Sequence, residues 1–309
     1  MKSVTKVIGI IIITAVSVLF FGCSSAENNK SKAVEFRYVQ PPALFTPMQG
    51  ANYVARNFWK HYTPSVDSVA LDKASKEFIL ALVSTQGSNL EPSVNNAFVK
   101  ADSLAVAGNK RLILKLISDA ESAFYYPNSP YLNEEVYLLF LNNFLNAKGV
   151  SDLDKLAYEY HKKICSLNRW GTVAADFEYK SLSPNGKYKV SSMHSIKSEY
   201  TLLFFNNPDC RSCADILEKL KGSNVSSLVG SKRLSVLAMY IDEQIDVWST
   251  NRELYPKEWI YAYDPNFILR DNQLYGLRAI PSMYLLDKEK RVILKDAPVE
   301  AVISYLGTI

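Results

Sequence analysis

Two cysteines three positions apart, Cys210 and Cys213, are the residues of this chain best suited to chemistry. They lie between an apolar run expected to form a strand and a segment expected to form an amphipathic helix. The second cysteine belongs to the buried stripe of that helix, at i, i+3, i+4 and i+7 spacing, with Ile216, Leu217 and Leu220. The first cysteine is then at the first helical turn, where free backbone N–H groups and the helix dipole stabilise a thiolate.

This placement predicts thiol-disulfide exchange. The thiolate of Cys210 would attack a disulfide of a partner protein, and Cys213 would then attack Cys210 to resolve the mixed disulfide. Arg211 is a candidate for lowering the pKa of Cys210 further, whereas the negative charge of Asp209 would raise it. The sequence leaves open which of these two neighbours prevails.

Other uses of the pair stay open. A zinc site needs about four ligands, and with His194, the nearest histidine in sequence, the pair would still lack one. A purely structural disulfide between the two cysteines is a second alternative for an exported chain. Peroxidase chemistry is disfavoured, because Asn207 stands where peroxiredoxin-like sites have threonine. We expect no metal and no cofactor.

The order of strand, cysteine pair and helix, followed about 70 residues later by Ala279, Ile280 and Pro281 before another apolar run, resembles a thioredoxin fold. The resemblance implies that Pro281 is a cis-proline packed against the sulfurs. It also implies that the backbone of Ile280 pairs with the incoming chain. The long gap between pair and proline, around residues 248–263, is similar to the insertions of exported TlpA/ResA-like thiol-disulfide oxidoreductases.

Most of the chain also resembles a class of bacterial lipoproteins in which a helical domain of unknown function precedes a thioredoxin-like domain. Residues 169–177, 207–210 and 281–287 carry this likeness. The chain departs from the pattern in two ways: Asp209 replaces the usual tryptophan before the first cysteine, and no proline lies between the cysteines. These departures bear on redox potential and partner choice rather than on the exchange chemistry.

The amino-terminal segment has the pattern of an export signal. Two lysines precede an apolar run over residues 7–21, which is shorter than the roughly 18 residues of a membrane-spanning helix. Residues 19–23 resemble a bacterial lipobox, which implies lipid attachment at Cys23. We therefore predict a signal peptide over residues 1–22 and a lipidated tether over residues 23–45, anchored to a membrane and facing the periplasm. A short anchor that is never cleaved is the alternative.

Length and texture predict two further domains. The 309 residues exceed the usual size of one domain, and a hydrophobic share of 48% excludes global disorder. Residues 46–168 have helical spacing of apolar positions, and residues 169–309 alternate strand-length apolar runs with helical stretches. We predict an α+β two-domain chain: an all-α helical bundle followed by an α/β thioredoxin-like domain with a central mixed sheet.

The strands of the second domain are expected at the apolar runs and at a hairpin signal around Ser-Pro-Asn-Gly. These segments are residues 177–182, 187–190, 200–205, 234–241, 259–263, 282–286 and 291–294.

Several other residues have both a functional and a packing interpretation. Cys165 and His161, one helical turn apart, could bind metal or activate a thiol, but a small core thiol is the commoner role. Residues 124–126 with Tyr131 could line a groove for a glycan or peptide, or pack as core and rim. Two tryptophans, Trp248 and Trp259, could border the Cys210 sulfur or pack in the core, and the sequence favours neither role.

These observations predict an exported, membrane-tethered thiol-disulfide oxidoreductase that acts through its Cys-Arg-Ser-Cys motif. Its partners would be thiols and disulfides of exported proteins and an unidentified redox donor. A formal charge of +4, spread evenly along the chain, is too small for a nucleic-acid-binding face. The competing hypothesis is a non-catalytic lipoprotein that serves as a binding or scaffold module and has a structural thioredoxin-like domain.

Overall fold

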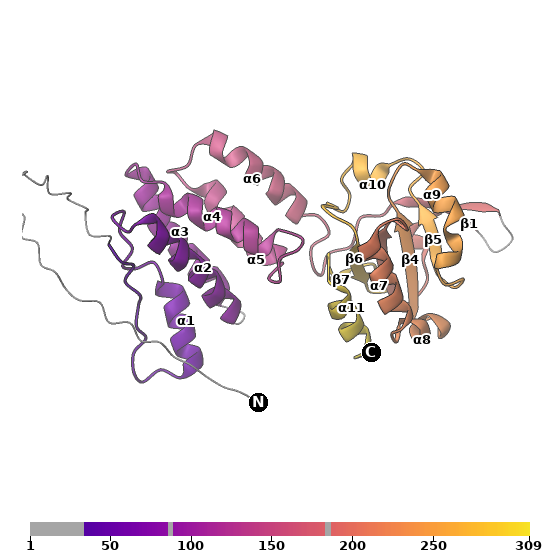
Figure 1. The fold of residues 1–309 in the computed structure, drawn as a ribbon, viewed down its shortest axis with the longest axis horizontal. Coiled ribbons are helices and arrows are strands. Elements are labelled where there is room, and N and C mark those ends of the chain that lie inside the picture. Colours follow the sequence, from indigo (N-terminus) through magenta and orange to yellow (C-terminus); the bar gives the residue numbers. More distant parts are fainter. Residues whose placement is uncertain (1–33, 86–88, 183–186) are drawn as a thin grey trace, which may run out of the picture.

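A computed structural model describes residues 34–85, 89–182 and 187–309. It shows a helical domain followed by an α/β domain with a central sheet (Figure 1). The predicted two-domain fold class is confirmed. The predicted signal peptide and Cys23 lie outside the described residues. No helix within the described ranges is long and apolar enough to cross a membrane.

The helical domain is built from amphipathic helices with a shared aromatic and aliphatic core. Asp67, Asn133 and Ser151 cap the starts of three helices through their side chains, which accept backbone N–H hydrogen bonds. The helices are α1 (Pro47–Asn57), α2 (Ser68–Ser84), α3 (Leu90–Val106), α4 (Arg111–Phe124), α5 (Glu134–Asn146) and α6 (Asp152–Cys165). Phe78 and Phe140 lie at the centre of the core with no exposed surface.

The helical domain starts earlier than the sequence predicted. Phe36 is 7% exposed and stacks on Phe58 with ring centroids 5.5 Å apart, and Val34 pairs with Val66 in a β-bridge. The segment 34–45, assigned from the sequence to the tether, is therefore attached to the packed domain from residue 34 onward. The segment contains many apolar residues but has no helical periodicity, so the sequence did not single out these anchoring side chains.

The α/β domain is organised around one mixed sheet of seven strands in the order β2-β1-β5-β4-β3-β6-β7. The central strands β3, β4 and β5 are parallel, and β1, β2, β6 and β7 are joined by antiparallel pairings. The strands are β1 (Glu178–Leu182), β2 (Tyr188–Ser192), β3 (Tyr200–Asn206), β4 (Leu234–Tyr240), β5 (Ile260–Tyr263), β6 (Ser282–Leu286) and β7 (Val292–Leu294). Each expected strand is present, with ends displaced by at most two residues.

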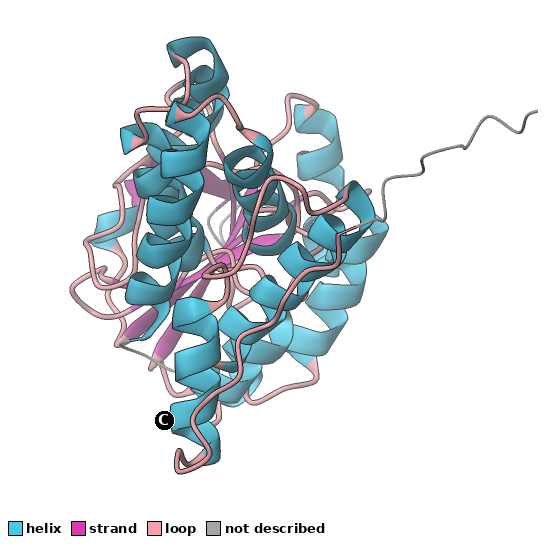
Figure 2. Cartoon of the chain, turned by 90° about the vertical axis from the view of Figure 1, so that its left-hand side faces the viewer, coloured by secondary structure: helices cyan, strands magenta, loops and turns pink. Residues whose placement is uncertain are grey.

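Both faces of the sheet are covered, as the continuous apolar runs predicted. Along β3, Leu202 and Phe204 join the core under α7 (Arg211–Lys221) and α11 (Val299–Leu306), whereas Leu203 and Phe205 join the core on the opposite face. The shorter helices are α8 (Val225–Gly230), α9 (Ile245–Thr250) and α10 (Ile268–Asp271). In Figure 2 the strands of the sheet lie behind the helices.

Candidate functional site

Cys210 is the N-cap of α7, so the cysteine pair occupies the start of that helix. The backbone N–H of Cys213 donates to the Cys210 sulfur at 3.4 Å, and the Ser212 hydroxyl lies 3.1 Å from the same sulfur. A tight turn leads into the cap, because Asn207 accepts hydrogen bonds from the N–H groups of Cys210 and Asp209 at 3.1 and 2.8 Å. The geometry therefore presents the Cys210 sulfur to the free N–H groups of the first helical turn.

Hydrogen bonding favours the thiolate of Cys210. Burial raises the pKa of this thiol, but hydrogen bonds from Cys213 and Ser212 lower it by more, so the pKa of Cys210 lies below its ordinary value. The side chain is partly exposed. Cys210 thus combines thiolate character with access from solvent, which is what a nucleophile in disulfide exchange needs.

Cys213 has the opposite character. Its side chain is 2% exposed, and burial raises the pKa of its thiol to about 12, with a further rise from the neighbouring Cys210 and from the charge of Asp242. Asp242 also accepts a hydrogen bond of 2.5 Å from the side chain of Asn207, which holds the carboxylate beside the turn. At neutral pH Cys213 is therefore a buried, protonated thiol, whereas its neighbour one turn away has a lowered pKa.

The sequence named Arg211 and Asp209 as the groups that tune Cys210. Both side chains are exposed, and their proposed effects stay predictions. Ser212, whose hydroxyl contacts the sulfur directly, was not predicted from the sequence as a tuning group. Its position two residues after the N-cap was the available signal, because that position lies in the first turn of the helix.

The Ile280-Pro281 peptide bond is cis, as the resemblance implied. Phe205 of β3 pairs in register with Ser282 of β6, which places Pro281 beside the end of β3, where the chain turns toward the cysteine pair. Ile280 and Pro281 are both partly exposed. Their role in binding a partner chain stays a prediction.

A buried polar network that the sequence analysis missed lies under the turn. Asn206 donates to the backbone oxygens of Phe204 and Met239 at 2.7 and 3.4 Å, and its own oxygen accepts from the hydroxyl of Tyr255 at 2.5 Å. Burial raises the pKa of Tyr255, and the charges of Cys213 and Cys210 raise it further. The inserted segment therefore contributes a tyrosine close to the sulfurs.

The two tryptophans of the insertion pack in the core. Trp248 is 2% exposed and stacks on Tyr261 with centroids 5.5 Å apart, and Trp259 is 3% exposed. Both belong to the hydrophobic cluster on the α7 and α11 face of the sheet. Of the two alternatives, core packing is the one realised.

The other cysteine and the histidines also have packing roles. Cys165 has no exposed surface, and burial raises the pKa of its thiol to about 12, so it is a core residue. His161 lies 3.0 Å from the Tyr137 hydroxyl, and His194 lies 2.8 Å from the Ala174 carbonyl oxygen. The described part of the chain contains no group of three or more histidine, cysteine, aspartate or glutamate side chains suited to a metal ion.

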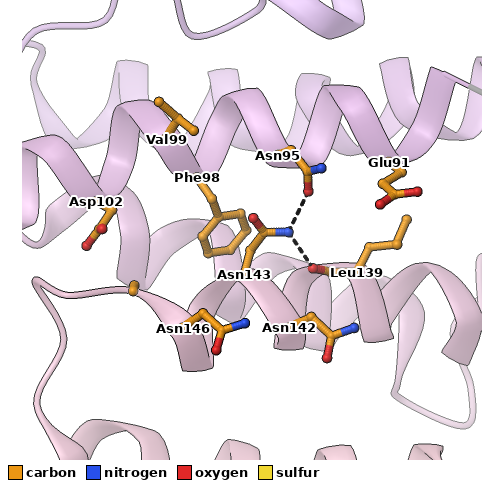
Figure 3. A pocket seen from close by; sticks show the side chains of 10 residues that line it. Glu91, Asn95, Phe98, Val99, Asp102, Leu139, Asn142, Asn143 and Asn146 are labelled. Carbon is orange, nitrogen blue, oxygen red and sulfur yellow. Dashed lines mark hydrogen bonds between the residues drawn. The ribbon is translucent and has the colours of Figure 1, made fainter.

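Several cavities open on the described part of the helical domain. One of about 640 Å³ is bordered by Tyr126 and Tyr131, so part of the expected tyrosine groove exists, while Tyr125 is buried. Another, about 360 Å³, lies between α3 and α5, and four of its ten lining residues are asparagines (Figure 3). There Asn143 donates to the side chain of Asn95 at 2.8 Å, so the cavity wall is internally hydrogen-bonded.

Known proteins resemble both halves of the chain. Residues 22–168 match a domain of unknown function, DUF5106. The crystal structure of a thioredoxin-like protein from Bacteroides caccae is 30% identical, with a TM-score of 0.79 over 88% of this chain and 98% of that protein. Because this match takes in both domains, it confirms a helical domain followed by a thioredoxin-like domain.

Two further solved structures each match slightly less than half of the chain. The carboxy-terminal domain of an uncharacterized protein from Bacteroides fragilis is 42% identical, over 45% of this chain and 98% of that one, with a TM-score of 0.42. The thioredoxin domain of a thiol-disulfide oxidoreductase from Bacteroides vulgatus is 17% identical, over 45% and 96%, with a TM-score of 0.39. No curated protein is significantly similar to the chain.

Proposed function

The chain belongs to the family of thioredoxin-like proteins, and from this premise we propose that it is a thiol-disulfide oxidoreductase acting through Cys210 and Cys213. The observation that carries the proposal is the contrast between the two sulfurs. The partly exposed Cys210 has a lowered pKa, and the buried Cys213 has a pKa of about 12. A structural disulfide or a scaffold would not need this contrast, whereas sequential attack by two thiols does.

In the reducing direction, the Cys210 thiolate attacks one sulfur of the partner's disulfide. A new S–S bond forms, the partner's S–S bond breaks, and its second sulfur leaves as a thiolate that takes up a proton. Cys213 then loses its proton and attacks the Cys210 sulfur, which releases the partner's first sulfur as a thiol. Two electrons have passed from the pair to the partner, and a redox donor of the same dithiol class must restore the reduced pair.

We further propose that the protein is exported and tethered to a membrane through a lipid on Cys23, with its redox domain facing the periplasm. The apolar run at residues 7–21 and the lipobox-like residues 19–23 support this location. The insertion between the cysteine pair and Pro281 supports a TlpA/ResA-like subtype. Exported proteins with thiols or disulfides are then the partners.

Trapping of mixed disulfides tests the exchange activity. In cells that produce Cys213→Ser, the adduct with a partner cannot be resolved, so we expect covalent, reductant-sensitive adducts with exported proteins. Cys165→Ser is the matched control, because it removes a buried thiol outside the pair, and Cys210→Ser/Cys213→Ser should give no adducts. If Cys213→Ser forms none, and the wild-type disulfide resists a dithiol donor, the scaffold hypothesis replaces this one.

The mass of the membrane-extracted protein tests the anchor. We expect an amino terminus at Cys23 with the added mass of a diacylglycerol group, and loss of membrane association in Cys23→Ala. An unmodified amino terminus at any other residue would remove the lipid anchor from the proposal without affecting the exchange chemistry.

A further inference from the structure

Four charged side chains meet where the two domains touch, and we call Glu134, Arg278, Lys295 and Asp296 the junction cluster. Glu134 lies 2.6 Å from Arg278 and 2.6 Å from Lys295, and Arg278 lies 3.0 Å from Asp296. The side chains are 9% exposed at Glu134, 14% at Arg278 and 12% at Lys295. Asp296 is 21% exposed, and two cations and two anions are thus balanced in a mostly buried site that borders a cavity of about 340 Å³.

The junction cluster holds both ends of the Ile280-Pro281 segment. Arg278 precedes Ile280 by two residues, and Ser282 directly follows Pro281. The hydroxyl of Ser282 donates to Asp296 at 2.6 Å, and the same carboxylate is paired with Arg278. The backbone that the partner chain would meet is therefore flanked by Arg278 and Ser282, and both of these side chains bind the carboxylate of Asp296.

The helical domain supplies the other half of this support. Glu134 is the first residue of α5, and the guanidinium of Arg278 lies 4.1 Å from the ring centroid of Tyr125 and donates to the Tyr125 carbonyl oxygen. Lys295 donates to the carbonyl oxygens of Cys165, at 3.0 Å, and of Leu167, at the end of α6. Three segments of the helical domain thus converge on the cluster.

Such an arrangement fixes geometry more than it adds stability. Buried ion pairs contribute little net stability compared with apolar side chains of equal volume, because both charges must be desolvated. The guanidinium of Arg278, however, donates hydrogen bonds through Nη1 to the Tyr125 carbonyl oxygen and through Nη2 to Asp296, and the Glu134 carboxylate forms an ion pair with the same Nη2. Because the guanidinium is planar and its hydrogen bonds have fixed directions, these contacts orient the backbone of Arg278. Without Glu134, Arg278 would keep the Asp296 carboxylate, Lys295 would keep the carbonyl oxygens of Cys165 and Leu167, and the carboxylate from the helical domain that links the two cations would be lost.

We propose that Glu134 of the helical domain is a positioning residue for the redox site: through Arg278 and Asp296 it holds the backbone at Ile280-Pro281 in the geometry that pairs with a polypeptide disulfide. The inference rests on the proposed exchange function. Through Glu134 the helical domain would contribute to the affinity for polypeptide partners. The sulfur chemistry at Cys210 would not depend on Glu134.

Two probes separate these contributions in the full chain. One is a fluorogenic peptide with an internal disulfide, which can pair with the backbone at Ile280. The other is 2-hydroxyethyl disulfide, which has no peptide backbone. We expect Glu134→Gln to raise KM for the peptide about five-fold or more, with kcat and the rate with 2-hydroxyethyl disulfide unchanged.

Glu135→Gln is the matched control. Glu135 is the next residue of α5 and also pairs across the domain boundary, with Arg169, but both of these side chains are more than two-fifths exposed. This variant should leave both probes unaffected. If Glu134→Gln does not fold, Arg278→Lys, which keeps the charge but not the fork, should show the same rise in KM.

The outcomes are distinct. An unchanged peptide KM in Glu134→Gln, or in Arg278→Lys where the first variant fails to fold, overturns the inference and leaves the exchange function standing. Equal losses with the two probes also overturn it, because they indicate general damage to the site. A wild-type protein that reduces neither probe overturns the proposed function and this inference with it.

Discussion

Replacing Ser212 with alanine should slow the attack by Cys210 at low pH and accelerate it at high pH. The Ser212 hydroxyl lies 3.1 Å from the Cys210 sulfur and lowers the pKa of that thiol. Alanine removes this hydrogen bond and leaves the backbone of the first helical turn in place. The pKa of Cys210 should therefore rise, which reduces the thiolate fraction and strengthens the remaining thiolate as a nucleophile.

The size of both effects follows from the geometry. A hydrogen bond to a charged group contributes about 1.5 to 3 kcal/mol when buried, but Ser212 is exposed, so water retains most of this and about 0.5 to 1 kcal/mol is lost. That loss leaves about two- to five-fold less thiolate below the pKa. Nucleophilicity rises with a Brønsted slope of about 0.4 to 0.5, so each thiolate reacts about 1.4- to 2-fold faster.

The reaction of the reduced protein with 4,4′-dithiodipyridine measures both limits, because absorbance reports each attack on this small disulfide. Below the pKa of Cys210 the Ser212→Ala rate should be about 1.5- to 2.5-fold lower than the wild-type rate. Above the pKa, where the thiol is fully ionised in both proteins, it should be about 1.4- to 2-fold higher. The two pH–rate curves should therefore cross.

Ser227→Ala on α8 provides the control, because Ser227 is likewise an exposed helical serine. Its pH–rate curve should superimpose on that of the wild type. Parallel curves for Ser212→Ala, slower at every pH, would indicate lost access or structure instead of a changed pKa. Curves that coincide with the wild type would refute the role assigned to the Ser212 hydroxyl.

Three further results are expected. At pH 8 a thiol with a pKa of about 12 is ionised to roughly one part in ten thousand, so iodoacetamide should label Cys210 long before Cys213 or Cys165; peptide mass mapping that finds comparable rates would contradict this. Phe36→Ala should lower the free energy of unfolding of the helical domain by about 3 kcal/mol in urea titrations, and no loss would return residues 34–45 to the tether. Tyr255→Phe should destabilise the α/β domain by about 1 to 2 kcal/mol, because it leaves the buried Asn206 oxygen without its donor; equal stability would show that the network contributes nothing.

The strands, the helix after the cysteine pair and the position of Pro281 were predictable because each depends on local sequence. An apolar run such as residues 200–205 has few alternatives to a central strand, and the stripe that begins at Cys213 fixes the face of its helix. Whether Trp248 borders the cysteine site or packs in the core was not predictable, because an indole ring is suited to either position.

The missed residues share another property: their partners are distant in sequence. Tyr255 donates a hydrogen bond to Asn206, which is 49 positions away in the sequence, and Glu134 forms an ion pair with Arg278 of the other domain. Charged and polar residues have no periodicity that reveals such partners, so the junction cluster is visible only in three dimensions. Phe36 was missed for a related reason, since the apolar residues around it show no helical periodicity and its ring partner Phe58 is distant in sequence.

The sulfur that would begin the proposed exchange is also the cap of its own helix. While it is a thiolate, Cys210 accepts the N–H of Cys213 and places a negative charge at the positive end of α7. Once that sulfur is part of a disulfide, its negative charge is gone, and the N–H groups at the start of α7 lose a charged hydrogen-bond acceptor. In the proposed exchange, helix energetics and electron transfer are therefore coupled in one atom, and the cap stabilises the thiolate of the reduced pair.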